Sequence, residues 1–251
     1  MLWTALGEYG KKRHGSENTG SNIVLTKIRR DDDNRSLIQH FMRTSGDAGR
    51  GRELILGDIL LDHHVSTVGM LSGTSMVLKL VKARTWHEHI KVFWKRSRTH
   101  TEYTGAQLLN SIGIAAPEVY EMGISFPIPR NALYIGYYLM EDLRDTGFKS
   151  LSEMQDHLSV EQISALTRNI SDTLAILDQN SVLYSDLHLD NIFCHQGNMS
   201  LKFIDTGAKR YKRRKVFEKK HKKAIRNLRS SIELSCLQGT ELDIYCQSLN
   251  K

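Results

Sequence analysis

The sequence contains few cysteines and few prolines, and it lacks a long hydrophobic run. Of its 251 residues, 3 are cysteine and 3 are proline. Cys194, Cys236 and Cys246 form no C-x-x-C pair and no even-numbered set, which excludes a disulfide framework and favours a reduced, intracellular setting. No stretch approaches the roughly 18 to 20 apolar residues of a transmembrane helix, and residues 1–20 lack the apolar centre of a secretory signal. We therefore expect a cytoplasmic protein.

Most of the chain lacks an excess of positive charge, although the net charge is +7. Residues 209–229 hold twelve Lys or Arg and a single acid, Glu218, and so carry a net charge of +11. The remaining residues together carry −4. Charge concentrated in this way predicts a polyanionic partner for one segment, such as nucleic acid, a membrane surface or a phosphorylated substrate. A hydrophobic content of 40% excludes a wholly disordered chain.

Short apolar stretches and a few helical patterns predict an α+β protein. Residues 1–50 are largely polar and predict an extension, with a strand at 23–28 and a helix at 36–42. Ser159 and Gln162 form a capping box at the start of a buried helix that ends near Asn180. Helical spacing also covers 85–109, and a weakly amphipathic helix lies within the basic segment. The other predicted strands are 54–61, 65–71, 76–81, 118–123, 133–140, 191–194 and 200–204.

Two aspartates and an asparagine follow the buried helix within twenty residues of one another. Asp186 lies on a predicted loop, Asn191 begins a predicted strand five residues later, and Asp205 ends the return strand of that hairpin. Carboxylate and amide oxygens at such junctions suit Mg²⁺, which is held by one or two carboxylates and substrate phosphates. Each residue alone is equally typical of a turn, because Asp and Asn bond to the local backbone. Together they are the set that phosphoryl transfer needs.

The spacing D-L-x-x-x-N, followed by a hairpin and D-x-G, resembles the catalytic and metal-binding loops of the protein-kinase-like superfamily. His188 gives the form D-L-H-x-x-N, which looks more like the small-molecule and sugar kinases of that superfamily than its protein kinases. The resemblance implies that Asp186 is the catalytic acid or base. It also implies that Asn191 and Asp205 bind Mg²⁺ and that ATP is the phosphate donor.

The resemblance also implies a lysine on a central strand and a glutamate on the helix that follows. Lys79 ends the apolar run Met-Val-Leu-Lys, with Lys82 as a competing candidate, and Glu102 is favoured over Glu88 as its partner. Glu141 and Leu143 lie in the expected connection between lobes, where their backbone groups would pair with adenine. Both would therefore belong to the nucleotide site.

The sequence departs from the superfamily pattern at three places. No G-x-G-x-x-G lies between the first two strands of the expected sheet, where Asp62, His63 and His64 stand instead. Tyr184 and Ser185 replace the usual His-Arg or His-Gly before Asp186. Thr206 replaces Phe in the metal loop, which speaks against regulation by a moving Phe.

A narrower resemblance points to the bacterial lipopolysaccharide core kinases, the heptose and Kdo kinases. It rests on D-L-H-L-D-N-I-F, on L-N-S-I-G-I-A-A-P at 109–117 and on a D-x-G followed at once by a basic helical tail. It implies a two-lobed protein-kinase-like α+β fold, with a small antiparallel-sheet N-lobe and a reduced, mainly helical C-lobe. The expected divisions are an extension at 1–50, an N-lobe at 51–143 and a C-lobe at 144–251. The implied activity is phosphate transfer from ATP to a sugar hydroxyl of the lipopolysaccharide core.

Other functions remain open at this point. A small-molecule kinase of the aminoglycoside or choline type fits the same loops. Tyr211 and Phe217 interleave with the basic run and are compatible with a nucleic-acid-binding protein without enzymatic activity, although no nucleic-acid motif occurs elsewhere. The D-T-G of an aspartic protease is present once and is followed by a basic run instead of a β-rich half. The paired histidines at 63–64 and 87–89 lack a spaced third ligand for zinc.

The basic segment at 209–229 predicts peripheral association with an anionic membrane. Like charges four residues apart on a helix repel one another, and an anionic surface or ligand relieves that repulsion. Each Lys or Arg near an anionic bilayer contributes about 1 kcal/mol of attraction. We expect the inner face of the cytoplasmic membrane, where a phosphorylated glycan or lipid acceptor would lie, and we do not expect a nucleic-acid partner.

Overall fold

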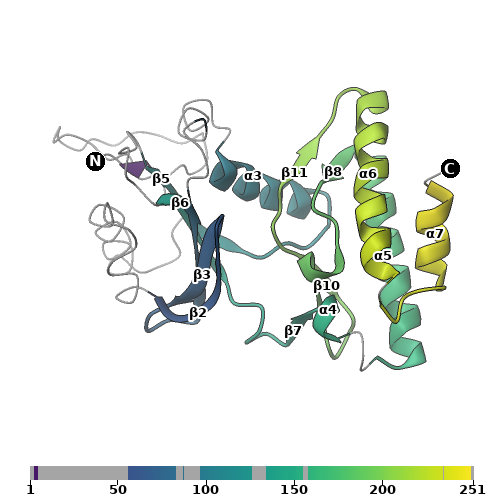
Figure 1. The fold of residues 1–251 in the computed structure, drawn as a ribbon, viewed down its shortest axis with the longest axis horizontal. Coiled ribbons are helices and arrows are strands. Elements are labelled where there is room, and N and C mark those ends of the chain that lie inside the picture. The colour runs from purple at the N-terminus through teal and green to yellow at the C-terminus, as the bar shows by residue number, and fades with distance from the viewer. Residues whose placement is uncertain are drawn as a thin grey trace. The chain divides into compact units, whose positions relative to one another are not determined.

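The computed structural model describes residues 3–4, 56–82, 87, 97–125, 134–154, 158–233 and 235–249 (Figure 1). The chain forms two compact units, which we call the first unit (Met1–Thr101 and Glu118–Asp142) and the second unit (Glu102–Pro117 and Leu143–Lys251). The strand predicted at 23–28 and the helix predicted at 36–42 lie outside the described residues. The extension at 1–50 and the lobes at 51–143 and 144–251 stay predictions.

The first unit is built on a six-stranded antiparallel sheet with the strand order β1-β5-β6-β4-β3-β2. Its centre is buried, because β6 is apolar along its length and β4 contributes Leu78 and Leu80, which are fully buried. The strand expected at 133–140 is therefore confirmed as a buried one. The strands are β1 (Trp3–Thr4), β2 (Leu56–His63), β3 (Ser66–Leu71), β4 (Met76–Lys82), β5 (Val119–Ser125) and β6 (Tyr134–Glu141).

The turn between β3 and β4 has the predicted composition Ser72-Gly73-Thr74. Gly73 has a φ of 76°, a left-handed conformation that glycine adopts without a steric penalty. The Thr74 amide donates to the Leu71 carbonyl oxygen at 3.0 Å and closes the turn. This hairpin therefore fixes the register that places Lys79 opposite Val68 on β3.

Helix α3 (Arg98–Ser111) begins four residues before Glu102. The sequence predicted a helical pattern from 85, and of residues 83–96 only His87 is described. After the helix, Gly113 has a φ of 83°, and the Ile114 amide donates to the Leu109 carbonyl oxygen at 3.0 Å. The chain thus leaves the helix through a glycine, as a left-handed C-terminal cap requires.

The second unit is mainly helical, with two small sheets. The capping box is confirmed: the Ser159 hydroxyl accepts from the Gln162 amide at 3.3 Å, and Gln162 Oε1 accepts from the Ser159 amide at 2.9 Å. Its elements are β7 (Phe148–Ser150), α4 (Leu151–Met154), α5 (Val160–Gln179), β8 (Val182–Tyr184), the short helix η3 (Leu189–Asn191), β9 (Ile192–His195), β10 (Leu201–Phe203), β11 (Ala208–Arg210), α6 (Arg214–Ile232) and α7 (Glu241–Leu249).

Helices α5, α6 and α7 pack together beside the small sheets (Figure 1). Helix α6 buries one apolar face, which makes it more strongly amphipathic than the sequence suggested. Arg214 joins its first turn to the end of α5: the guanidinium donates to the Asp178 backbone oxygen at 2.7 Å and to both Asp178 carboxylate oxygens. The buried residues of α6 are Phe217, His221, Ala224, Ile225, Leu228 and Ile232.

The two small sheets position the loops that the sequence singled out. In one sheet, of order β10-β9-β7, the hairpin β9–β10 confirms the two strands predicted around Gln196-Gly197-Asn198. In the other, β11 pairs with β8. Asp186 lies on the loop after β8, and Asp205 lies between β10 and β11.

Candidate active site

The loop between β8 and β9 is closed by the side chain of Asn191. Asn191 is 6% exposed, and its Nδ2 donates to the backbone oxygen of Asp186 at 2.9 Å. The same Nδ2 lies 2.9 Å from Nε2 of His188. The Asp186 carboxylate, in contrast, is 59% exposed. The loop therefore buries its amide and presents its first carboxylate to solvent.

His188 completes this loop through both ring nitrogens. An amide nitrogen cannot accept a hydrogen bond, so Nε2 is the acceptor from Asn191 and the ring proton of neutral His188 lies on Nδ1. Nδ1 is 3.2 Å from the Asp190 carboxylate, and Nε2 is 3.5 Å from that of Asp186. Hydrogen bonding to Asp186 is the largest influence and raises the pKa of His188; burial opposes it, and the charges of Asp186 and Asp190 add to the rise.

Asp205 occupies a left-handed conformation, with a φ of 50°. Non-glycine residues adopt this region infrequently, and aspartate is among those that tolerate it best. The preceding residue is held on two sides: the Ile204 amide donates to the Asn191 carbonyl oxygen at 3.0 Å, and the Tyr184 hydroxyl donates to the Ile204 carbonyl oxygen. Asn191 and the residue before Asp205 thus belong to one hydrogen-bonded network.

Tyr184 is the last residue of β8 and is buried next to the loop that carries Asp186. It is 1% exposed, and burial raises the pKa of its phenol well above the ordinary value. The negative charges of Asp205, Asp186 and Glu102 raise that pKa further, in this order. The sequence marked Tyr184 only as a departure from the superfamily, and no local pattern revealed that its hydroxyl donates to the Ile204 carbonyl oxygen.

Lys79 and Lys82, the two candidate lysines on β4, have different surroundings. Lys79 is 4% exposed, and its Nζ lies 5.5 Å from the centre of the Tyr138 ring on β6. Lys82 Nζ binds the Asp62 carboxylate at 2.5 Å and the His63 carbonyl oxygen at 2.9 Å across the β2–β3 hairpin. Lys82 is thus engaged in a partly exposed ion pair, whereas Lys79 is buried.

The remaining predicted residues are Glu102, Glu141 and Leu143. Glu102, on α3, is 6% exposed and belongs to the second unit, whereas Lys79 belongs to the first. Glu141 ends β6, and its amide donates to the Glu118 carbonyl oxygen at 3.0 Å. The Leu143 carbonyl oxygen accepts from the amides of Thr146 and Phe148. The Glu141 amide and the Leu143 carbonyl oxygen therefore already form hydrogen bonds within the protein, although the sequence predicted that backbone groups of these two residues pair with adenine.

The donor set of Asn191 and Asp205 fits a hard cation. Both amide hydrogens of Asn191 are directed at protein acceptors, which turns its Oδ1 oxygen away from them. Amide and carboxylate oxygens are ligands that Mg²⁺ accepts. Within the described ranges there is no group of three or more His, Cys, Asp or Glu side chains gathered as for a metal ion.

The basic residues of β11, of helix α6 and of the segment between them are largely exposed, and we call the exposed ones the basic face. Lys209 on β11 and Lys220 on α6 share one aromatic ring: their Nζ atoms lie 5.7 Å and 5.3 Å from the centre of the Tyr211 ring. The exposed members of this basic face are Lys209, Arg210, Lys212, Arg213, Arg214, Lys215, Lys219, Lys220, Lys222, Lys223 and Arg226. Among the described residues no helix is both long and apolar enough to cross a bilayer.

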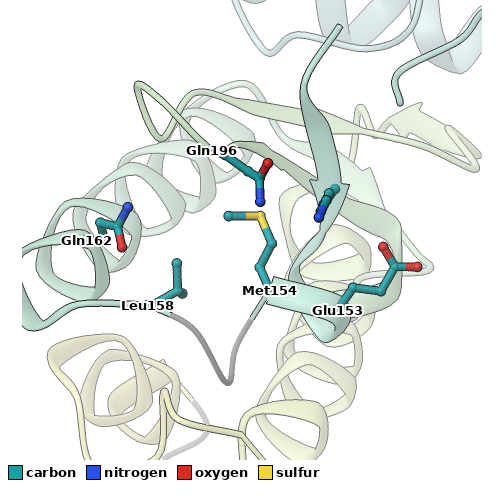
Figure 2. Close-up of a pocket in the computed structure, with 6 residues that line it drawn as sticks. Glu153, Met154, Leu158, Gln162 and Gln196 are labelled. Carbon is teal, nitrogen blue, oxygen red and sulfur yellow. The ribbon is translucent and has the colours of Figure 1, made fainter. Parts of the chain in front are cut away.

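A pocket of about 80 Å³ lies beside α4 in the second unit (Figure 2). Its wall combines Met154 and Leu158 with polar side chains, among which Figure 2 shows Glu153, Gln162 and Gln196. Small-molecule sites usually enclose roughly 300 to 1,000 Å³. The pocket is too small for such a ligand, and we assign it none.

Comparison with known proteins identifies the fold. No protein-family model matches the chain, and no curated protein matches it in sequence. A solved structure described as "WaaP in complex with acyl carrier protein" is similar, with a TM-score of 0.55, 12% sequence identity and coverage of 85% of each chain. A likeness at this identity shows a shared fold. It confirms the α+β class with an antiparallel sheet, whereas the two-lobed arrangement stays a prediction.

Proposed function

We propose that this chain is an ATP-dependent kinase that transfers the γ-phosphate of ATP to a hydroxyl group. The observation that carries the proposal is the network joining the two motifs: Asn191 bonds to the Asp186 backbone and to the residue before Asp205. Motifs with the spacing of kinase loops are thereby held together as one site. The fold shared with WaaP supports the same class of chemistry.

Each predicted residue has one role in this proposal. Asp186 accepts the proton of the attacking hydroxyl, and its exposed carboxylate is accessible to an acceptor. Lys79 binds the α- and β-phosphates, and Glu102 positions Lys79. Backbone groups of Glu141 and Leu143 pair with the adenine edge.

Asn191 and Asp205 would hold Mg²⁺. When bound, the ion neutralises charge on the β- and γ-phosphates. The protein's own contribution is to fix both ligands before nucleotide arrives: Asn191 through its two amide hydrogen bonds, and Asp205 through the bonds on Ile204. Ligands fixed in advance need no rearrangement during the reaction.

The acceptor we propose is a heptose or Kdo sugar of the lipopolysaccharide core. Two observations support it: the D-L-H-x-x-N motif and its surroundings resemble the lipopolysaccharide core kinases, and the chain shares its fold with WaaP. A small-molecule kinase of the aminoglycoside or choline type is the alternative with the same chemistry. A nucleic-acid-binding protein without enzymatic activity would bind duplex or RNA in a salt-dependent way and hydrolyse no ATP.

The basic face on α6 would bring the enzyme to its acceptor. We propose peripheral association with the inner face of the cytoplasmic membrane, where a phosphorylated glycan or lipid would be bound. Ile225 and Leu228 are buried within the unit, so the helix contacts a membrane through charge and not by deep insertion. WaaP was solved with acyl carrier protein, and a carrier protein is a second partner to test against this face.

Mass spectrometry of lipopolysaccharide from the host and from its deletion strain tests the proposal. We expect one core phosphate to disappear on deletion and to return with the unaltered gene or with Asp190→Asn, but not with Asp186→Asn. Unchanged core phosphate in the deletion strain would refute the lipopolysaccharide acceptor. If the purified protein also lacked Mg²⁺-dependent binding of ATP, the kinase proposal itself would be wrong.

A further inference from the structure

Thr206, between Asp205 and Gly207, is bonded to helix α3 by its side chain. Its hydroxyl donates to the backbone oxygen of Glu102 at 2.7 Å, and the two residues are 104 positions apart in the sequence. Thr206 is 5% exposed and Glu102 is 6% exposed. A buried hydroxyl–carbonyl bond is directional, so it fixes a distance and an angle that an apolar contact leaves free.

Gly105 allows the loop to approach the helix this closely. A Cβ atom at Gly105 would lie 1.5 Å from the Thr206 backbone oxygen and 2.7 Å from the Ala208 backbone nitrogen. Both are backbone atoms, which cannot move aside as the end of a side chain can. Gly105 follows Glu102 by three residues and so lies on the same face of α3. Glycine is therefore required at position 105, where the loop of Asp205, Thr206 and Gly207 (the metal loop) lies against α3.

The metal loop itself is tightly folded between this contact and the network around Ile204. The Gly207 amide donates to the Asp205 carbonyl oxygen at 2.7 Å, and the Ala208 amide donates to the Thr206 carbonyl oxygen at 2.5 Å. On the other side, Ile204 is held by Tyr184 and Asn191. The left-handed Asp205 thus lies between two fixed residues.

We propose that Thr206 and Gly105 are positioning residues that hold the metal loop on α3 in one arrangement. The loop–helix contact (Thr206, Gly105 and the Glu102 carbonyl) keeps Asp205 in its left-handed conformation. It also ties Asp205 to the turn of α3 that carries Glu102. The role of Asp205 as a metal ligand rests on the proposed function, whereas the contact itself does not. Moving the loop away from α3 would break this buried bond and separate the close backbone contact, which disfavours other positions of the loop.

Amide hydrogen exchange in the nucleotide-free protein tests the contact directly. Thr206→Val keeps the shape of the side chain and removes its hydroxyl, and we expect the Gly207 and Ala208 amides to exchange about fivefold faster, the effect of one net hydrogen bond. Thr206→Ser should restore the rate of the unaltered protein. Thr173→Val is the matched control, because the Thr173 hydroxyl donates to the Asn169 carbonyl oxygen at 2.8 Å within α5, away from the loop. Equal or slower exchange in Thr206→Val would overturn the proposal.

Calorimetric titration with ATP and Mg²⁺ separates this inference from the proposed function. We expect Thr206→Val to weaken Mg²⁺-dependent ATP binding about fivefold, with recovery in Thr206→Ser. If the unaltered protein bound no ATP, the kinase proposal would fail while the exchange rates still decided the contact. If ATP bound equally to the Thr206→Val protein, the contact would have no positioning role. Unchanged exchange at Gly207 and Ala208 in Gly105→Ala would also contradict the proposal.

Discussion

Replacing Asp186 by asparagine is expected to slow phosphate transfer by about 10²- to 10⁴-fold, or about 2.7 to 5.4 kcal/mol in activation free energy. Asparagine keeps the size of the side chain and the backbone oxygen that accepts from Asn191 at 2.9 Å. Because the carboxylate is 59% exposed, its loss should change the free energy of unfolding by about 0.5 kcal/mol at most. The effect should therefore fall on the rate and leave ATP affinity unchanged.

Asp190→Asn is a matched control for this substitution. Asp190 lies on the same loop, its carboxylate is 70% exposed, and it faces His188 Nδ1 at 3.2 Å. Both variants lose one negative charge beside His188, but only Asp186 has the proposed role of proton acceptor. The assay is single-turnover transfer from ATP to lipopolysaccharide of the deletion strain, with ATP affinity measured in parallel. An unchanged rate in Asp186→Asn, or an equal loss in Asp190→Asn, would refute the reasoning.

Three further predictions concern the nucleotide site, the basic face and helix α6. Lys79→Met should weaken ATP binding by about 10- to 100-fold, because a charged hydrogen bond of roughly 1.5 to 3 kcal/mol is lost. Lys82→Met should leave ATP binding unchanged. Equal effects of the two substitutions on ATP affinity, measured by calorimetry, would contradict this assignment. Replacing Lys219, Lys220, Lys222 and Lys223 by Gln should lower the affinity for anionic vesicles by about 10²- to 10³-fold at low salt, as measured by co-sedimentation. An unchanged affinity would contradict the proposed membrane contact. The pKa of His221 is lowered, chiefly by burial; the charge of Asp178 raises this pKa and that of Arg214 lowers it. The neutral His221 side chain therefore stabilises the fold fully above its unfolded pKa of about 6.5, and this contribution is lost as pH falls. His221→Gln should reduce the fall in Tm between pH 7.5 and 5.5, and an unaltered pH profile of Tm would count against this assignment.

Long elements with local signals could be predicted from the sequence. The helix after Ser159 has a capping box and apolar residues at helical intervals, and the structure has it at Val160–Gln179. The apolar run at 133–140 became a buried central strand for the same reason: its pattern reflects burial on both faces. The three-residue strands β7, β8 and β11 were missed, because three residues are too few to show a period of two.

The motifs of the candidate site could be recognised in the sequence, but its long-range bonds could not. Asp186, Asn191 and Asp205 stand out because their spacing is local, and their roles stay predictions. Tyr184 and Thr206 were read as departures from a pattern, but their hydroxyls bind backbone oxygens of residues 20 and 104 positions away. No local periodicity encodes such partners. Lys79 was preferred to Lys82 from the sequence and stays a prediction, whereas the ion pair between Lys82 and Asp62 joins residues 20 positions apart and was not foreseen.

The basic segment and the catalytic loop are joined through one short strand pair. β11 pairs with β8, which places Ala208 opposite Tyr184 and Lys209 opposite Leu183. β8 leads into the loop of Asp186, so the positive charge begins on the strand that is hydrogen-bonded to the start of that loop. If the proposed function holds, an anionic acceptor attracted to the basic face would be concentrated near the loop of Asp186, which would aid encounter and contribute nothing to the chemical step. Added salt should then raise the acceptor KM and leave kcat at saturating acceptor unchanged; a salt-dependent fall in that kcat would mean that the charge acts in the transition state instead.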